Sequence, residues 1–326
     1  MLYINRTSTD PYFNLAAEEY VLKNFQEDCF MLWQNAPCII VGKHQNTLAE
    51  INYEYVKENN IPVVRRISGG GTVFHDLGNL NFTFIKEGKE EELVNFRKFT
   101  KPILEVLQTL DIDAKFEGRN DLTIKGKKFS GNAEHVHKKR VLHHGTLLYS
   151  AILPDLTKAL KVDPVKFKDK AVKSVRSRVT NIAEHLQEPM GIEEFKKKIK
   201  DFVLGQYPDA REYDLTEQDL ANIEELVSTK YGTWDWNFGY SPRYNFKKSV
   251  KCNGGNVEFN FNVKNGIIEK VKIYGDFFNT REIAEFEEML IGLEHEEKHI
   301  REKIRGIDIE KYFNHTEAEE LIQGMF

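Results

Sequence analysis

The chain has 326 residues, enough for one large or two ordinary domains, and its 40% hydrophobic and 12% aromatic content is typical of a folded globular protein. Its net charge of -5 argues against a general nucleic-acid binder, which would need a basic surface. Three scattered cysteines without metal-ligand spacing indicate free thiols in a reducing compartment.

The N-terminal segment does not have the pattern of a signal peptide, because no basic stretch precedes an apolar one. No apolar run in the chain reaches the length that a bilayer-spanning helix needs. These observations predict a cytoplasmic protein that does not enter a membrane.

The first third of the chain is expected to alternate short strands with two helices. The predicted elements are a strand at 2–4, a helix at 14–25 after a turn at Asp10 and Pro11, strands at 30–33, 38–41 and 61–64, a strand through Phe82 and Phe84, and a helix at 91–110. Residues 42–46 (GKHQN) follow a predicted strand end. They form either a plain polar loop or part of a site shared with the glycine-rich stretch that follows.

The most informative stretch is 65–81, which reads RRISGGGTVFHDLGNLN. Its three consecutive glycines, 69–71, permit backbone conformations and close ligand approaches that side chains would prevent. Arg65 and Arg66 add guanidinium groups that suit phosphate or carboxylate. Further ligand-capable side chains are Ser68, Thr72, His75, Asp76, Asn79 and Asn81. The spacing matches neither the dinucleotide fingerprint nor the Walker phosphate loop, so the stretch predicts an anion site of another type.

A second polar group begins with GRND at 118–121, before a predicted strand at 122–124, and continues with KGKKFSGNA at 125–133. Its lysines could form a solvated basic hairpin turn. Lys128, however, lies just before a predicted turn of small residues at 130–133, where a ligand could approach. A lysine ammonium is a compact charge suited to a phosphate or a developing oxyanion.

Residues 135–140 are predicted to form a mobile basic loop, followed by a core strand in the HHGTLL segment, 143–148. Neighbouring residues of a strand face opposite sides, so only one of His143 and His144 can face a given site. This argues against a metal centre made of both histidines. One of the two is expected to hydrogen-bond a ligand or the lysine segment.

The C-terminal part is expected to be a separate small domain, which gives domains at 1–244 and 248–326. Helices are predicted before the boundary at 192–207 and 217–231. Beyond it, the strand signal is the alternation of Val257, Phe259, Phe261 and Val263, then a turn at Asn265–Gly266 and a returning strand through Ile267, Val271 and Ile273. Asn279 and Glu282 predict a capping box at the start of a helix, and shorter segments at 307–312 and 316–322 complete the chain.

Five blocks, in this order, resemble the bacterial lipoate-protein ligase A family. They are the 65–81 stretch, GRNDL with KKFSGNA, HHGTLL, SVRSRVTN at 174–181 and WDWNFG at 234–239. The resemblance extends over nearly the whole chain. It implies an α+β fold, with a large mixed-sheet domain like that of biotin ligases and class II aminoacyl-tRNA synthetases and a small C-terminal α/β accessory domain. It also implies a ligase that uses ATP and Mg²⁺ to adenylate lipoate or octanoate and then transfers the acyl group to a lysine.

The resemblance assigns roles to positions that match the family motifs. Lys128 matches the catalytic lysine, which also contacts ATP and lipoate, and Asp121 falls where the family binds metal. The other positions implied to contact ATP or the adenylate are Arg66, Gly70, Gly71, Thr72, Val73, Phe74, Asn120, Ser130, Ala133 and Thr146. Those implied to contact lipoate, besides Lys128, are Arg66, Gly71, His75 and His144. Arg176 and Arg178 could support the site wall or meet an acidic acceptor domain.

A lipoyl tail would need an apolar tunnel. The candidates for its lining are Leu32, Trp33, Val41, Val73 and Phe74, which ordinary core packing would explain equally well. The acceptors that the resemblance implies are the lipoyl domains of 2-oxoacid dehydrogenase E2 subunits and the glycine cleavage H protein.

Three alternatives belong to related or different classes. An ATP-independent lipoyl or octanoyl transferase works through a cysteine thioester, but no cysteine lies between 127 and 148. A biotin ligase has a glycine-arginine adenylation loop that residues 65–71 do not match. A non-catalytic acyl-adenylate binding protein would be expected to lack Lys128 or Asp121, and both are present.

Overall fold

The structure is a computed structural model that describes residues 1–88, 95–152, 158–160, 167–169, 179–277 and 279–326. Its contacts divide the chain into two compact units. The large unit comprises Met1–Lys43, Asn60–Lys158 and Ser174–Thr233, and the C-terminal unit comprises His44–Asn59, Ala159–Lys173 and Trp234–Phe326. The C-terminal unit therefore includes a segment from near the start of the chain, which carries α2 (Thr47–Glu50) and α3 (Tyr53–Glu58).

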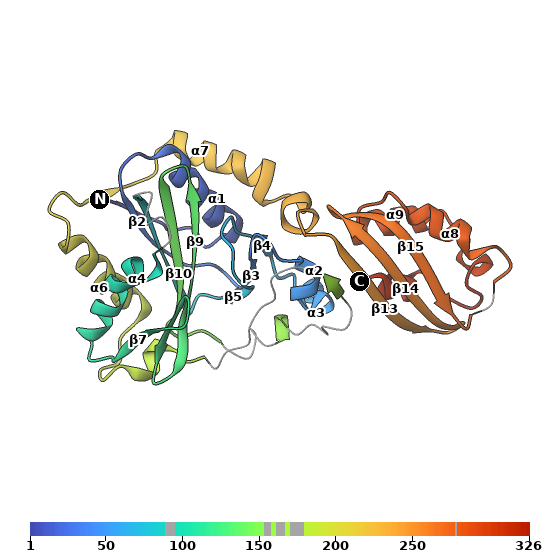
Figure 1. The fold of residues 1–326 in the computed structure, drawn as a ribbon, viewed down its shortest axis with the longest axis horizontal. Coiled ribbons are helices and arrows are strands. Elements are labelled where there is room, and N and C mark those ends of the chain that lie inside the picture. Colours follow the sequence, from blue (N-terminus) through green and yellow to red (C-terminus); the bar gives the residue numbers. More distant parts are fainter. Residues whose placement is uncertain (89–94, 153–157, 161–166, 170–178, 278) are drawn as a thin grey trace. The chain divides into compact units, whose positions relative to one another are not determined.

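The large unit is built on an eight-stranded mixed sheet (Figure 1). Its strands, in spatial order, are β12 (Arg211–Tyr213), β1 (Leu2–Ile4), β2 (Cys29–Trp33), β6 (Asn79–Glu87), β10 (Arg140–Leu148), β9 (Lys127–His137), β8 (Asp121–Ile124) and β7 (Ala114–Glu117). β1 is parallel to β2 and β12, whereas the other neighbours are antiparallel. A second sheet has the order β4 (Val63–Arg65), β3 (Cys38–Val41) and β5 (Val73–His75).

The two faces of the large sheet have different partners. α4 (Phe96–Gln108) and α6 (Ile192–Gly205) cover one face, where Phe82 and Phe84 pack with Phe99 and Phe195 in one apolar core (Figure 1). α1 (Pro11–Asn24) packs against the other face through β6 and β10, and α7 (Glu217–Leu226) packs on α1. Because side chains alternate along β6, Thr83 points to α1 and donates a hydrogen bond to the Glu18 carboxylate. This second face is the polar one.

The C-terminal unit has an antiparallel sheet with short helices. The strands, in spatial order, are β11 (Phe167–Asp169), β13 (Tyr244–Cys252), β14 (Gly255–Lys264) and β15 (Ile267–Gly275). The helices are α8 (Ile283–Leu290), α9 (Glu297–Ile304) and α10 (Ala318–Met325). Short helical turns lie at Asp235–Gly239 and Ile309–Lys311 in this unit, and at Ile182–His185 and Val227–Tyr231 in the large unit. The predicted alternation is confirmed, since Val257, Phe259, Phe261 and Val263 are all buried.

The mixed-sheet α+β fold and most predicted elements are confirmed. Asp10 caps α1, since its carboxylate accepts from the Tyr12 amide at 2.8 Å, and the Asn265–Gly266 turn has the positive φ angles, 50° and 76°, that this hairpin needs. The helix predicted at 91–110 is observed from Phe96 to Gln108, and 89–94 lie outside the described residues.

Three local predictions are wrong. The turn expected at 130–133 and the loop expected at 135–140 belong to one long hairpin, in which β9 and β10 pair as far as His137 with Arg140. Pairing with neighbouring strands on both sides outweighs the turn-like composition of the segment. The capping box at Asn279 is also wrong, because α8 begins only at Ile283 and the Asn279 amide donates to the Arg281 carbonyl instead.

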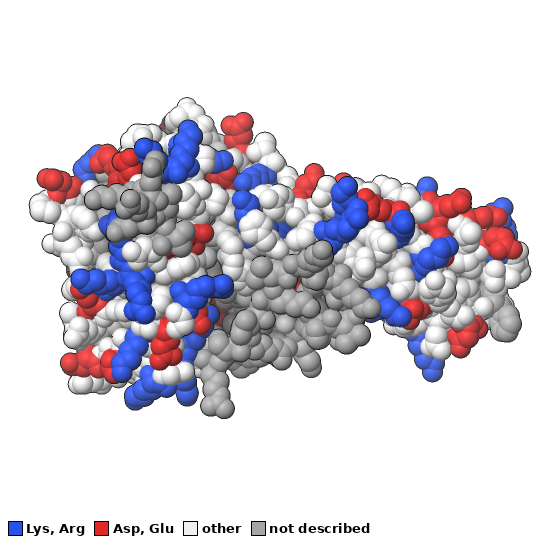
Figure 2. Space-filling model, viewed as in Figure 1, with Lys and Arg blue, Asp and Glu red and all other residues white. Residues whose placement is uncertain are grey.

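Basic and acidic side chains are interspersed on the surface of the protein. On the face seen in Figure 2, lysines and arginines alternate with aspartates and glutamates, in keeping with the small net charge of -5. Within the described ranges, no helix combines the length and the apolar character that crossing a bilayer would require.

Candidate active site

The guanidinium of Arg66 holds the glycine loop in shape. Its Nη2 donates to the carbonyls of Gly69 and Gly71 at 2.7 and 2.8 Å, and its Nε donates to Ser68 Oγ at 3.0 Å. Burial lowers the Arg66 pKa to about 10, which leaves the group charged at neutral pH. The loop therefore folds around a fixed positive charge, as an anion site requires.

The adjacent Arg65 has a different task from the one expected. It is fully buried, and its Nη1 donates to the carbonyls of Gly42 and Lys43 at 3.1 and 3.0 Å. The Lys43 amide in turn donates to the Ser68 carbonyl at 2.9 Å. Arg65 thus fixes the start of the GKHQN segment beside the glycine loop, and Arg66 provides the charge at the loop itself.

Ser68 continues from Arg66 into a buried chain of hydrogen bonds. Ser68 Oγ lies 2.6 Å from His144 Nε2, and His144 Nδ1 lies 3.0 Å from the Glu18 carboxylate. Arg66 can only donate and an ionised carboxylate can only accept. Nδ1–H therefore donates to Glu18, and when Nε2 carries no proton the Ser68 hydroxyl donates to it. This chain orients the ring of His144 on the polar face of the sheet, and His143 faces the other way, as the alternation of strand side chains predicted.

His75 lies close to this chain and is buried and neutral. Burial lowers its pKa to about 3, with a further contribution from the charge of Arg66. Its Nδ1 is 3.1 Å from the amide of Asn35, which donates to it, so the proton is on Nε2. Within the described part of the chain, buried polar atoms without a hydrogen-bond partner include His75 Nε2, Asn79 Oδ1 and Asn81 Nδ2. These atoms can hydrogen-bond a ligand on the polar face of the large sheet. Trp33 lies next to them, since its ring packs edge-on against the ring of His75.

A β-bulge turns Lys128 toward the polar face. Thr123 pairs with Lys128 but Leu122 pairs with Ser130, so β9 has one extra residue at this point. A Cβ on Gly131 would lie 3.1 Å from Lys128 Nζ, which shows that the ammonium crosses over this glycine. The ammonium forms a 2.7 Å ion pair with Asp121, and both side chains are partly exposed, at 28% and 34%.

Other predicted residues near Lys128 lie on both faces of the sheet. Thr146 Oγ1 accepts from the Gly131 amide at 3.1 Å, and Ala133 pairs with His144, so both belong to the polar face. Ser130 does not, because its hydroxyl accepts from Asn132 on the opposite face. Asn120 lies at the start of β8, where its amide donates to the Asn132 carbonyl at 2.5 Å.

The remaining predicted residues lie in the glycine loop, in the small sheet or on β2, or are not described. Gly70 has a φ of +93°, Thr72 and Phe74 are buried, and Val73 is half-buried at the start of β5. Among the candidates for an apolar lining, Leu32, Trp33 and Val41 are fully or almost fully buried. Arg176 and Arg178 lie outside the described residues.

Glu18 is the residue of this site that the sequence analysis did not identify. It lies on α1 and is 1% exposed, and its carboxylate also accepts from Thr83, to which the Trp33 indole donates at 2.9 Å. The available signal was the adjacent pair Glu18 and Glu19 inside an otherwise apolar helix. A buried carboxylate is costly unless several donors satisfy it.

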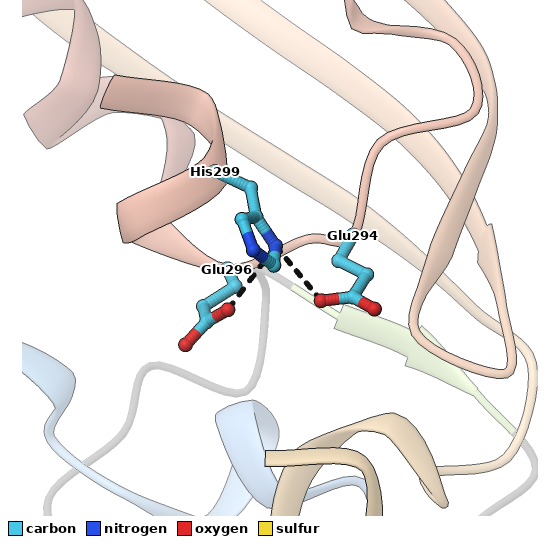
Figure 3. Close-up of side chains that lie close together, drawn as sticks. All are labelled: Glu294, Glu296 and His299. Atoms are coloured by element: carbon cyan, nitrogen blue, oxygen red, sulfur yellow. Dashed lines mark ion pairs between the residues drawn. The ribbon is translucent and has the colours of Figure 1, made fainter. Parts of the chain in front are cut away.

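A metal-capable group of three side chains lies in the C-terminal unit. Among the described residues, Glu294, Glu296 and His299 are the three histidine or acidic groups close enough to hold an ion (Figure 3). His299 Nδ1 forms ion pairs with the two carboxylates, at 2.8 and 3.2 Å, at the start of α9. These pairs already engage Nδ1 of the imidazole, and the group shares no residue with the predicted site.

Two family models match the chain. Residues 10–203 match the lipoyl protein ligase A/B catalytic domain, and residues 241–325 match the bacterial lipoate protein ligase C-terminus. The protein is therefore an enzyme with the ligase fold in its large unit. The chain belongs to the lipoate-protein ligase family. It is 47% identical to lipoate–protein ligase 1 of Staphylococcus aureus, with 98% of both chains covered, and 41% identical to lipoate-protein ligase LplJ of Bacillus subtilis, with 100% of both covered.

Solved structures agree with this assignment. The fold is similar to the archaeal bi-partite lipoate protein ligase of Thermoplasma acidophilum, studied with its E2 lipoyl domain, at 27% identity and a TM-score of 0.64, covering 73% of this chain and 96% of that one. Lipoate-protein ligase A bound with ATP is similar at 26% identity and a TM-score of 0.62, with 73% of this chain and 98% of that chain covered. P. falciparum LipL1 in complex with lipoate is similar at 26% identity and a TM-score of 0.62, with 99% of this chain and 97% of that chain covered.

Proposed function

We propose that this protein is an ATP-dependent lipoate-protein ligase. It adenylates free lipoate, or octanoate, and transfers the acyl group from the adenylate to the ε-amine of an acceptor lysine. The observation that carries the proposal is the polar face of the large sheet, where the Arg66 loop, His144 and the Lys128 ammonium belong to one unit. Relatives of 47% and 41% identity over the full chain, both lipoate-protein ligases, support it.

The first half-reaction brings together two anions, the lipoate carboxylate and the α-phosphate of ATP. A carboxylate oxygen bonds the α-phosphorus, the bond from that phosphorus to the β-phosphate oxygen breaks, and pyrophosphate leaves. Arg66 and Lys128 supply the positive charge that this approach requires. The backbone of Gly70 and Gly71, with Thr72, Val73 and Phe74, forms the wall around the triphosphate and the adenylate. Asn120, Ala133 and Thr146 complete it, and Ser130 contributes through its backbone because its hydroxyl is bonded to Asn132.

Lys128 serves both half-reactions. In the adenylate, its ammonium binds the acyl carbonyl and a phosphate oxygen together. When the acceptor amine attacks the carbonyl carbon, electrons move onto the carbonyl oxygen, and the ammonium stabilises that oxyanion. The C–O bond to phosphate then breaks, AMP leaves, the attacking nitrogen releases its proton to water, and an amide remains. Asp121 pairs with Lys128 at 2.7 Å and holds the ammonium in place while no substrate is bound.

Asp121 is also the residue that would hold Mg²⁺. Its carboxylate is partly exposed, at 34%, at the start of β8, and a carboxylate oxygen is the kind of ligand that Mg²⁺ prefers. When bound, the ion would offset the charge of the ATP phosphates.

Lipoate binds next to Trp33, on the polar face of the large sheet. The unpaired Nε2–H of His75 and the glycine loop at Arg66 and Gly71 are the groups that suit its carboxylate, while His144 lines the pocket. Buried Leu32, Trp33 and Val41 would provide apolar contacts for the tail, together with Val73 and Phe74. An apolar wall with few polar groups is typical of small-molecule sites.

The cysteines argue against the thioester route of the ATP-independent transferases. Cys29, Cys38 and Cys252 are free and buried. Burial raises the pKa of Cys29 to about 12 and that of Cys252 to about 11, and it raises the pKa of Cys38 as well. A nucleophilic cysteine needs the opposite shift. A non-catalytic adenylate-binding protein would not need the Lys128–Asp121 pair.

The acceptors are lipoyl domains of E2 subunits, a proposal that the likeness to the T. acidophilum ligase supports, and the glycine cleavage H protein. We place the reaction in the cytoplasm, and we propose that residues 1–244 carry adenylation and transfer while 248–326 form the accessory domain.

Intact-mass spectrometry of a purified E2 lipoyl domain tests the function. We expect a lipoyl mass increment that requires lipoate, Mg²⁺ and ATP. Lys128→Ala should lower the rate roughly a hundredfold, on the order of 3 kcal/mol of transition-state stabilisation. Lys127→Ala, an exposed lysine of the same strand, is the matched control and should retain the wild-type rate. Modification without ATP from an acylated donor protein would instead establish a transferase.

A further inference from the structure

A second network of hydrogen bonds lies on the opposite face of the sheet, behind Lys128. His143 Nδ1 lies 2.8 Å from Glu134 Oε1, and His143 Nε2 lies 3.2 Å from Asn132 Oδ1. The side chains of His143 and Glu134 are 0% and 2% exposed. The imidazole is stacked between the rings of Phe82 and Phe99, with centroids at 5.7 and 5.0 Å. The proposed mechanism uses none of these three polar residues.

The direction of each hydrogen bond follows from Asn132. Its Nδ2 donates to the Asn120 carbonyl at 3.1 Å and to Ser130 Oγ at 3.2 Å. The Asn120 carbonyl can only accept, so the amide cannot be flipped without placing two oxygens against each other. Oδ1 therefore faces His143, and His143 Nε2 must carry a proton.

One proton must then lie between His143 Nδ1 and Glu134. Either the imidazole is neutral and accepts from a carboxylic acid, or an imidazolium donates to a carboxylate; both forms are neutral as a pair. Loss of this proton would leave Nδ1 and a carboxylate facing each other without a donor. The ring could restore that bond only by moving its proton to Nδ1, and the bond to Asn132 would then be lost.

Asn132 connects this pair to the site. Its backbone amide and its side chain both donate to the Asn120 carbonyl, and the Asn120 side chain donates back to the Asn132 carbonyl. Asn120 is followed directly by Asp121, which forms the 2.7 Å ion pair with Lys128. A hydrogen bond from the Asn95 amide to Glu134 Oε2, at 3.1 Å, ties the other end of the network to the start of α4.

We propose that Glu134 and His143 share one proton and act as positioning residues, which fix Asn132 and thereby hold Asn120 and Asp121 in place beside Lys128. The inference rests on the proposed ligase function for its effect on rate, but not for the proton itself. The electrostatics agree with the form in which Glu134 is the acid. Burial raises the Glu134 pKa to about 7, and burial lowers the His143 pKa well below its usual value, with His144 as the other titratable group that acts on His143.

The position of the shared proton is tested first, on the wild-type protein. Nitrogen-15 NMR of the histidine rings at pH 6, with the signals assigned by their absence in His143→Phe, should show a neutral His143 with its proton on Nε2, or an imidazolium. A neutral ring with its proton on Nδ1 would overturn the proposal. This measurement needs neither lipoate nor ATP, so it stands even if no adenylate forms.

The positioning role is tested by rates of lipoyl-AMP formation. A glutamine at 134 can donate to Nδ1 without an acidic proton, so Glu134→Gln should retain most of the activity. It should also remove a fall in kcat that the wild-type protein shows as the pH rises through about 7. His143→Phe keeps the ring stacking but loses the donor to Asn132, and we expect kcat to fall about tenfold with the KM for lipoate within about twofold.

Glu117→Gln, an exposed glutamate of neighbouring β7, is the matched control and should leave both the rate and its pH profile unchanged. Thermal unfolding of every variant separates a positioning effect from loss of the fold. A Glu134→Gln profile identical to the wild type, or a His143→Phe variant with full kcat, would contradict the proposal. If the wild-type protein forms no adenylate, the proposed function fails while the NMR result remains valid.

Discussion

The two units bury different kinds of side chain. The interior of the large unit includes charged and titratable groups such as Arg66, Glu18 and His143, each satisfied by named partners. The core of the C-terminal unit is formed mainly by aromatic and aliphatic side chains, among them Phe259 and Phe261 on β14. The first interior depends on directional hydrogen bonds, whereas the second depends on removal of apolar area from water.

The difference indicates what each interior is for. A buried polar group costs free energy unless its partners are complete, so a protein designed for stability alone would use few of them. In the large unit such groups converge on the glycine loop and on the Lys128–Asp121 pair. They fix the positions of charges there. Burial of apolar side chains on the face toward α4 and α6 offsets the free energy that burying these polar groups costs.

The largest effect is expected from Phe259→Ala, which removes a fully buried ring from the apolar core. The lost burial and the cavity should destabilise the C-terminal unit by about 3–5 kcal/mol. In hydrogen exchange, the amides of β13 to β15 should lose protection while those of β6 and β10 keep theirs. Tyr274→Ala, on the same sheet but 58% exposed, is the control and should change stability little. Equal loss of protection in both sheets would contradict the division of the molecule into two kinds of core.

The apolar unit was also the easier one to predict from sequence. Strict alternation from Val257 to Val263 and the Asn265–Gly266 turn determine the β14–β15 hairpin locally. The polar motifs of the large unit were recognised as well, as were the glycine loop and the opposite orientations of the two adjacent histidines. Its polar interior was harder, because which residues of a helix or a strand become buried depends on pairing that is distant in sequence.

Three features show why. The small and basic residues of β9 have the composition of turns, and only their pairing with β8 and β10 makes them a strand. The bulge that turns Lys128 toward the site arises from that same pairing. Glu18 and Glu134 would usually be solvated, and they are buried here because donors from other elements surround them. The donors to these two carboxylates, Thr83 and the Asn95 amide, lie far from them in the sequence.

The second prediction concerns His295, a buried histidine in the apolar core of the C-terminal unit. Tyr244 OH donates to its Nδ1 at 2.7 Å, and its Nε2–H donates to the Met325 carbonyl at 2.6 Å, so both nitrogens are engaged in the neutral form. Burial lowers its pKa to about 4, from an unfolded value of about 6.5. Between these values the unfolded chain binds a proton that the folded one does not. Stability is therefore complete above pH 6.5 and falls as the pH drops toward 4, by about 3 kcal/mol in total.

Urea unfolding of this unit at a series of pH values, followed by exchange of the β14 amides, measures the effect. His315→Gln removes an exposed histidine of the same unit and should leave the slope between pH 6.5 and 4 unchanged. A wild-type stability that does not fall across this interval would show that the polar group in the apolar core tolerates a charge. The contrast between the two interiors would then be weaker than we describe.

The smallest effect is expected at Gly70, where the polar interior of the large unit depends on the backbone. Gly70 has a φ of +93°, a conformation that other residues rarely adopt, and a Cβ there would lie 3.0 Å from Arg66 Nη2. Gly70→Ala should therefore cost about 1–2 kcal/mol of stability. It should also displace the guanidinium from the Gly69 and Gly71 carbonyls, and weaken ATP binding by roughly the same free energy, about tenfold in Kd.

Gly69→Ala separates the two causes, because a Cβ on Gly69 would meet no other atom within 4 Å and its φ is not in the left-handed region. Its free energy of unfolding should match that of the wild type within about 0.5 kcal/mol, since neither strain nor a clash is introduced. Urea unfolding gives the stabilities, and titration calorimetry with ATP and Mg²⁺ gives the affinities. Equal losses of stability in the two variants would mean that the loop tolerates no side chain at all. A Gly70→Ala variant with wild-type affinity would mean that Arg66 holds the loop without helping to bind the nucleotide.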